Sequence, residues 1–144
     1  MKRIICITCL LALLLCACSA TTQTPSTPKR NYHYGIYELT FTEKLLSNDH
    51  VGNDWSFTYT HNGKVIENGY RVSEAFDLLG IERIGVKIRE EDNIDDVGTG
   101  NLSVMICEGG SGKTKVTVTE TDGRYTGNTA VWEISCKVKL VDKR

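Results

Sequence analysis

Proline is scarce in this chain, and its two prolines, Pro25 and Pro28, both lie in one short segment near the N-terminus. That segment, residues 19–30, has no large apolar side chain and so cannot contribute to a hydrophobic core. We therefore expect a disordered tether there, followed by a folded domain that begins near residue 32.

The sequence also has no cluster of basic residues. It contains 17 Lys and Arg against 18 Asp and Glu, for a formal charge of −1. This balance argues against binding to nucleic acid and against purely electrostatic binding to anionic lipid. Partners are expected to be neutral, cationic or held through a metal ion.

Signatures of catalysis are missing too. There is no Gly-x-Ser-x-Gly elbow, and His33, His50 and His61 are not spaced as metal ligands. Residues 107–114 place Cys107 where a nucleotide-binding loop needs Gly, and a strand pattern follows where that loop needs a helix. We predict neither an enzyme nor a nucleotide-binding protein.

No apolar run is long enough for a typical membrane span. Met1-Lys2-Arg3 is basic, the apolar run 4–15 is short, and small residues follow, which is the pattern of an export signal. The end of this run, Leu15-Cys16-Ala17-Cys18, resembles the lipobox of bacterial lipoprotein signals. An ordinary cleaved secretory signal is the alternative.

The lipobox resemblance implies that Cys18 becomes the lipidated N-terminus of the mature protein, carrying diacylglycerol and a further acyl chain such as palmitate. Two or more chains give stable anchoring without a membrane span. The expected location is the bacterial cell membrane or outer membrane, facing the periplasm or the exterior. The predicted organisation is a signal peptide (1–17), a lipidated Cys and flexible tether (18–31), and a folded domain (32–144).

Most of the folded domain alternates between apolar and polar residues with period two, as in half-buried strands. Asn62-Gly63 between two such runs predicts a hairpin, with 65–72 as its return strand. Residues 73–80 are expected to form a short helical turn between Ser73 and Gly80. Seven or eight short strands predict an all-β fold, an antiparallel β-sandwich.

The most unusual stretch is an acidic loop between two predicted strands. It sets five carboxylates within seven residues, and no Lys or Arg follows until Lys113. Charges this close are either fully solvated or gathered around a cation. Val97, beside the loop, is expected to pack under it. The five acids are Glu90, Glu91, Asp92, Asp95 and Asp96.

Residues 84–92, 95–98 and 102–104 resemble the strand, Asp-x-Asp loop and following strand of the C2 domain, a β-sandwich family that binds calcium and phospholipid. Residues 37–41 and 49–55 resemble its first strand and first calcium loop. In that family the two loops lie side by side at one end and share the metal.

The resemblance implies a calcium site, and calcium prefers such oxygen ligands. Here the loop is about three residues shorter than in the family, which favours one ion over two. A solvated loop without metal is the alternative, in an immunoglobulin-like adhesive or structural module whose edges or aromatic residues Tyr32, Tyr34 and Tyr125 contact a protein or glycan. The implied calcium ligands are Asp49, Asp54, Glu90, Asp92 and Asp95.

Cys107 and Cys136 remain once the signal is removed and Cys18 is acylated. Both lie on predicted strands of an exported domain, which allows a disulfide across the sandwich. Two free thiols behaving as small hydrophobic side chains fit the pattern equally.

Overall fold

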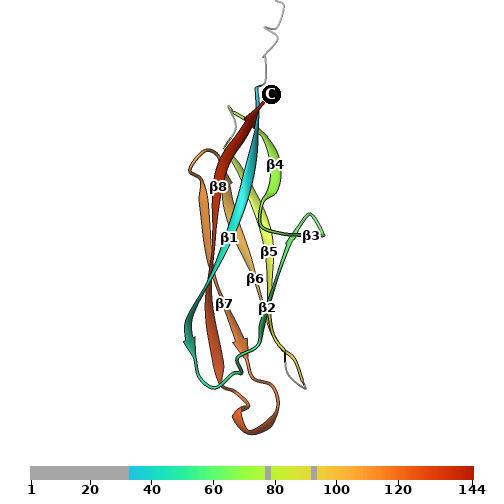
Figure 1. Cartoon of the computed structure of the whole chain (residues 1–144). Coiled ribbons are helices and arrows are strands. Elements are labelled where there is room, and N and C mark those ends of the chain that lie inside the picture. Colours follow the sequence, from blue (N-terminus) through green and yellow to red (C-terminus); the bar gives the residue numbers. More distant parts are fainter. Residues whose placement is uncertain (1–32, 77–78, 92–93) are drawn as a thin grey trace, which may run out of the picture. The chain divides into compact units, whose positions relative to one another are not determined.

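The computed structural model describes residues 33–76, 79–91 and 94–144. The predicted signal peptide and tether lie outside these residues. The described residues form one compact unit, whose strands lie side by side along its length (Figure 1). Its elements are β1 (Tyr34–Asn48), β2 (Trp55–His61), β3 (Lys64–Ile66), β4 (Tyr70–Ala75), β5 (Gly80–Glu90), β6 (Asp96–Ile106), β7 (Ser111–Thr119), a 3-10 turn η1 (Gly123–Tyr125) and β8 (Thr129–Lys143).

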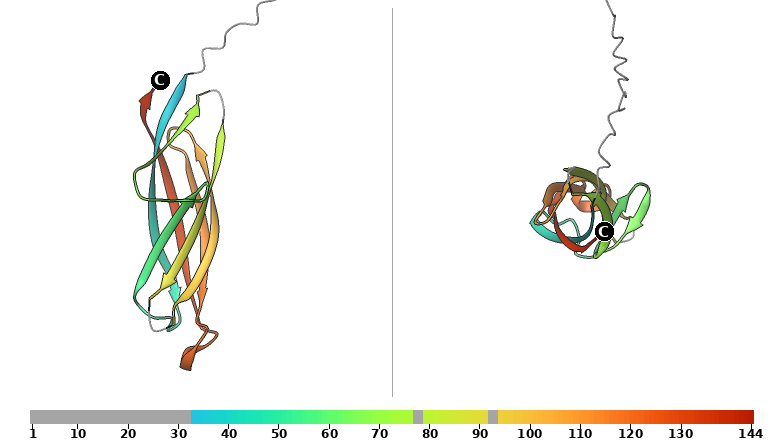
Figure 2. Two further views of the ribbon diagram at one scale, coloured as in Figure 1. Left: turned by 90° about the vertical axis from the view of Figure 1, so that its right-hand side faces the viewer. Right: turned by 90° about the horizontal axis from the view of Figure 1, so that it is seen from above.

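The strands form two antiparallel sheets of four strands each, which confirms the predicted all-β sandwich. We call the sheet with order β4-β1-β8-β7 sheet A, and the sheet with order β3-β2-β5-β6 sheet B. The view down the long axis in Figure 2 shows strands on all sides of the core.

Alternation along the strands places one apolar face of each sheet inside, as predicted. Each inner residue is followed by an outer one, so that apolar side chains from both sheets meet while polar ones face solvent. The largest fully buried side chains include Leu39, Ile84, Ile88, Leu102, Ile106 and Ile134.

One long side of the sandwich is closed by glycines. A Cβ at Gly98 on β6 would collide with the carbonyl oxygen of Thr117 on β7, and a Cβ at Gly112 on β7 would collide with that of Ser103 on β6. Glycine permits this close approach of two backbones because it has no side chain. The edges of the two sheets therefore cover one another here, which protects them from pairing with another chain.

The region after the Asn62-Gly63 hairpin differs from the prediction. The hairpin itself is confirmed, with φ of 49° and 75° at its two turn residues. The predicted single return strand over 65–72 is wrong, because the chain leaves β2 after Ile66 and turns at Gly69, where φ is 84°. The side-chain oxygen of Asn68 accepts a hydrogen bond from the Phe41 amide, and the Gly69 amide donates to the Leu39 carbonyl, so this turn is fastened to β1.

The predicted helical turn over 73–80 is also wrong for its first residues. Residues 73–75 belong to β4, which crosses to sheet A and pairs with β1, with Ala75 opposite Tyr34. Hydrogen bonds to the β1 edge outweigh the weak local helical preference. Residues 77 and 78 lie outside the described residues.

Cys107 and Cys136 are both free thiols. Cys136 is buried on the inner face of β8, and burial raises the pKa of its thiol to about 11. Cys107 is half-buried just beyond β6. Of the two alternatives left by the sequence, the structure shows the pair of free thiols.

The start of β1 and the last residue of the sequence meet at one end of the sandwich. The Tyr34 amide donates to the Arg144 carbonyl and the Arg144 amide to the Tyr34 carbonyl, both at 2.7 Å. Because β1 starts there, the loop that follows β1 lies at the opposite end, below the strands in Figure 1.

Candidate functional site

Three loops gather at the end opposite Tyr34, and we call this the loop end. They are residues 49–54 after β1, the turn between β5 and β6, and residues 120–128 before β8. The Asp49 amide donates to the Thr129 carbonyl at 3.0 Å, and the Glu91 amide donates to the Asp54 carbonyl at 2.7 Å. The two acidic segments singled out from the sequence therefore lie side by side.

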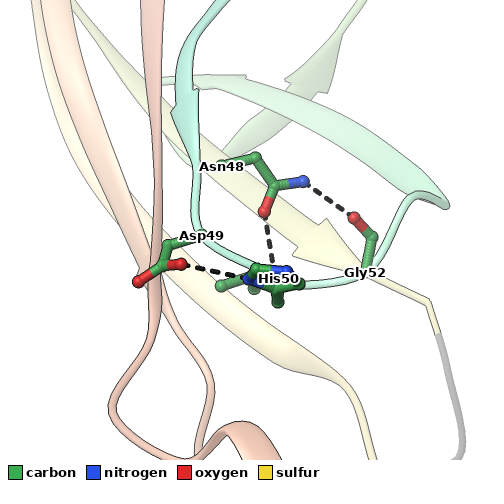
Figure 3. Close-up of polar contacts among 5 residues, drawn as sticks. Asn48, Asp49, His50 and Gly52 are labelled. Atoms are coloured by element: carbon green, nitrogen blue, oxygen red, sulfur yellow. Dashed lines mark hydrogen bonds and ion pairs between the residues drawn. The ribbon is translucent and has the colours of Figure 1, made fainter.

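The loop after β1 is held in shape by protein groups. Asn48 brackets it: its Oδ1 accepts from the Val51 amide at 2.8 Å and its Nδ2 donates to the Gly52 carbonyl at 2.9 Å (Figure 3). Val51 is fully buried, while His50 and Gly52 take positive φ values of 58° and 59°. The side-chain amide thus replaces backbone partners in a tight turn.

Two of the predicted calcium ligands on the surface have protein partners. Asp49 is exposed and contacts Nδ1 of its neighbour His50 at 3.1 Å. Asp95 forms an ion pair with Arg89, with 2.6 Å between Oδ2 and Nη2. Both carboxylates are at least one-third exposed, so solvent screens these contacts.

The other three predicted ligands lie in different settings. Asp54 is exposed just before β2. Glu90 is 3% exposed and packs against Gly52, where a Cβ would collide with its carboxylate. Asp92 lies outside the described residues.

These positions do not converge on one point. Within the described ranges, no group of three or more His, Cys, Asp or Glu side chains is placed to hold a metal ion. Calcium takes six to eight oxygen ligands, and the fifth predicted ligand, Asp92, is not among the described residues. Calcium at the loop end stays a prediction from the family resemblance.

Asp96 is a site residue that the sequence reasoning missed. It is 1% exposed, and its Oδ1 accepts two hydrogen bonds from Thr121, from the amide at 2.9 Å and from the hydroxyl at 2.6 Å. A signal existed, because Asp96 shares its phase with the inward-facing Leu102 and Val104. Its role is to connect the β5–β6 turn with the loop that precedes β8.

The same phase corrects the expectation for Val97. With Asp96 and Gly98 facing inward, Val97 must face outward, and it is 44% exposed. Val51 packs beneath the loop end in its place.

A hollow of about 540 Å³ opens between the loop after β1 and the loop before β8. The rings of His50 and Tyr125, which both line the hollow, stack with centroids 5.3 Å apart and an angle of 16° between their planes. The Arg124 guanidinium lies 6.0 Å from the centroid of the Tyr125 ring. Amide, imidazole, phenol and carboxylate groups all reach the hollow. Its lining is Asn48, His50, Gly52, Asn53, Glu120 and Tyr125.

Three aromatic side chains pack together between the two sheets near the loop end. Trp132 on β8 packs edge-on against Trp55 and Phe57 of β2, at centroid distances of 5.4 and 4.8 Å. Edge-to-face packing of this kind stabilises aromatic pairs beyond their burial. These contacts join β2 of sheet B to β8 of sheet A near the loop end.

Comparison with known proteins adds no family. No family model matches the chain, and no curated protein is significantly similar to it. In the described part of the chain, no helix has the length and apolar character needed to cross a membrane.

Proposed function

We propose that this protein is a membrane-anchored lipoprotein of the bacterial cell envelope, whose β-sandwich is a binding module that uses the loop end. The acyl chains on Cys18 supply the anchor. The chain enters the sandwich from its N-terminal side at Tyr34, and the hollow lies at the opposite end. This placement is the observation that supports the proposal.

This geometry suits presentation of a site away from a membrane. β1 has 15 residues, which at about 3.4 Å per residue spans about 50 Å. Residues 18–31 add further reach between the anchor and the sandwich. A partner would meet the loop end without competing with the lipid surface.

The lining of the hollow favours a neutral or cationic ligand rich in hydrogen-bonding groups. The side chains of Asn53, Glu120 and Tyr125 offer both donors and acceptors, and Tyr125 adds an amphipathic ring. A glycan or a short peptide has this chemistry. The metal-free adhesive module predicted as the alternative would share Tyr125 with this surface, but it could also use Tyr34 at the opposite end or the sheet edges, and it would need no calcium.

Anchoring and binding can be tested separately. In bacterial cells, the wild-type chain should incorporate an alkyne-tagged palmitate and sediment with membranes, whereas Cys18→Ala should do neither. A wild-type chain that stays soluble and unlabelled would refute the anchor and leave the binding proposal standing.

For binding, the detergent-solubilised full chain is applied to an oligosaccharide array and to a phage-displayed peptide library. Ligands selected by the wild type should be lost by His50→Ala/Tyr125→Ala and kept by Tyr34→Ala, a matched control because Tyr34 is 46% and Tyr125 43% exposed. Equal retention by both variants would place the binding surface elsewhere.

A further inference from the structure

Lysines that are dispersed in the sequence come together on the outer face of sheet A. Lys113 and Lys115 lie on β7, Lys137 and Lys139 lie on the adjacent β8, and all four are exposed. They face outward because the alternate positions, such as Val116 and Cys136, are buried. We call these four residues and the surface between them the lysine face.

The strand register arranges this face in a regular way. Ser111 lies opposite Lys137, and Lys113 lies opposite Ser135, so that two lysines and two serines alternate in a square. A shallow hollow of about 420 Å³ lies over this square, lined by both serines, both lysines, Gly112 and Cys136. Lysine ammonium and serine hydroxyl groups that line one hollow are donors suited to an anionic oxygen group.

Carboxylates on the same face do not balance the positive charge. Glu133 pairs with Lys113, with 3.1 Å between Oε1 and Nζ, and Glu38 pairs with Arg71 at 3.1 Å. Lys44, opposite Glu133, adds a further cation. The basic partner in each pair is exposed and the carboxylate is partly exposed, so solvent screens both pairs and an anionic ligand can compete for Lys113.

The lysines also form an extended track. Lys115 is level with Glu133 in the register, and Lys139 lies six residues further along β8. At about 3.4 Å per residue the track is about 20 Å long. This length suits a linear polymer with regularly spaced charges better than a single small anion.

We propose that the lysine face is a second binding site, which takes an acidic polysaccharide bearing carboxylate or sulfate groups. The serine hydroxyls, with Thr40 and Thr42 on the neighbouring β1, hydrogen-bond the sugar hydroxyls while the lysines bind the acidic groups. Among the described residues, no aromatic ring stands between the four lysines to stack on a nucleic-acid base, and no large apolar side chain stands there to insert into a bilayer.

This site is independent of the loop end and of the anchor on Cys18. It lies on the side of the sandwich, so a polysaccharide would run along the molecule while the loop end stays open.

Polygalacturonate oligomers are a direct probe, with dextran as the neutral control. We expect the detergent-solubilised full chain to bind fluorescent polygalacturonate saturably, to ignore dextran and to lose affinity as salt is raised. Lys113→Ser/Lys137→Ser should weaken binding at least tenfold. Arg83→Ser/Lys87→Ser removes the same charge from sheet B and should weaken it less than twofold. Thermal melting confirms that both variants fold, with Gln as the replacement if Ser does not fold.

Three results would overturn the proposal. The first is that the folded wild type does not bind polygalacturonate. The second is an equal loss of affinity in the two double variants, which would indicate an effect of net charge. The third is that single-stranded DNA or anionic lipid vesicles bind more tightly than polygalacturonate and depend on the same lysines.

Discussion

Asp96 accepts two hydrogen bonds from Thr121, one from the backbone amide and one from the side-chain hydroxyl. The two residues are 25 positions apart. Asp96 begins β6 in sheet B, and Thr121 follows β7 in sheet A. Their contact joins the two sheets at the loop end and fixes where the loop before β8 leaves the sandwich.

Loss of this contact should be costly for stability. Asp96→Ala should lower the free energy of unfolding by about 2–3 kcal/mol, because it removes both hydrogen bonds that the buried carboxylate accepts from Thr121. Thr121→Val should cost about 1 kcal/mol, since it removes the hydroxyl and keeps the amide. Urea denaturation of both single variants and the double variant measures their coupling. Asp95→Ala, which breaks an exposed ion pair, is the control at about 0–1 kcal/mol, and equal effects at 95 and 96 would contradict our interpretation.

The close approach of β6 and β7 at Gly98 predicts a second sensitive position. Gly98→Ala should destabilise the fold by about 1–3 kcal/mol, because the new methyl group meets the Thr117 carbonyl and the backbone must move. Thr99→Ala, one residue along and facing solvent, should change stability by less than about 0.5 kcal/mol. A Gly98→Ala variant that unfolds at the wild-type urea midpoint would show that β6 and β7 can move apart here at no cost in stability.

Calcium tests the family resemblance directly. Because Asn48 and Val51 already hold the loop after β1, we expect the melting temperature to be the same in EDTA and in millimolar calcium. A calcium-specific rise of several degrees, with magnesium as the control, would instead reveal a bound ion. If Asp92→Asn/Asp95→Asn abolished that rise, Asp92, outside the described residues, would be implicated as a ligand.

Alkaline pH should weaken the fold in a defined window. The Cys136 thiol has an ordinary pKa of 9.0, which burial raises to about 11. The folded chain then holds this proton to higher pH than the unfolded chain does, so the stabilisation is complete below pH 9 and is lost as the pH rises towards 11. Two pKa units correspond to about 2–3 kcal/mol.

Tyr59 should act in the same direction above pH 10. Burial, and then the hydrogen bond that it donates to the Glu43 carboxylate, raise the pKa of its phenol above the usual value. Urea midpoints at pH 8 and pH 10.5 measure the combined effect. Cys136→Ala should flatten the decline relative to Cys107→Ala, and an unchanged slope would assign the effect to other groups.

The period-two pattern predicted most of the architecture, because the alternation of buried and exposed residues can be recognised within each strand without knowing its neighbours. Asn62-Gly63 predicted its hairpin for the same reason, since both residues accept positive φ. The crossing of β4 to sheet A was not predicted, because it depends on hydrogen bonds between residues 68 and 69 and the distant β1.

The candidate site was predictable only in part. The sequence placed two acidic segments at one end, but it treated their carboxylates alike. Glu90 and Asp96 share the phase of buried neighbours and lie inside, whereas Asp54 and Asp95 lie outside. Stacking of His50 on Tyr125 and convergence of the lysines on β7 and β8 depend on contacts between distant residues, which no local pattern encodes.

The pairing of Tyr34 with Arg144 has a mechanical consequence. Tension applied between Tyr34 and Arg144 would separate β1 from β8 one hydrogen bond at a time and should meet little resistance. Tension between Tyr34 and the loop end would instead pull lengthwise along β1, loading its bonds to β4 and β8 together. A module that is anchored on the Tyr34 side and binds its ligand at the loop end would be loaded in this direction, in which it resists unfolding more strongly.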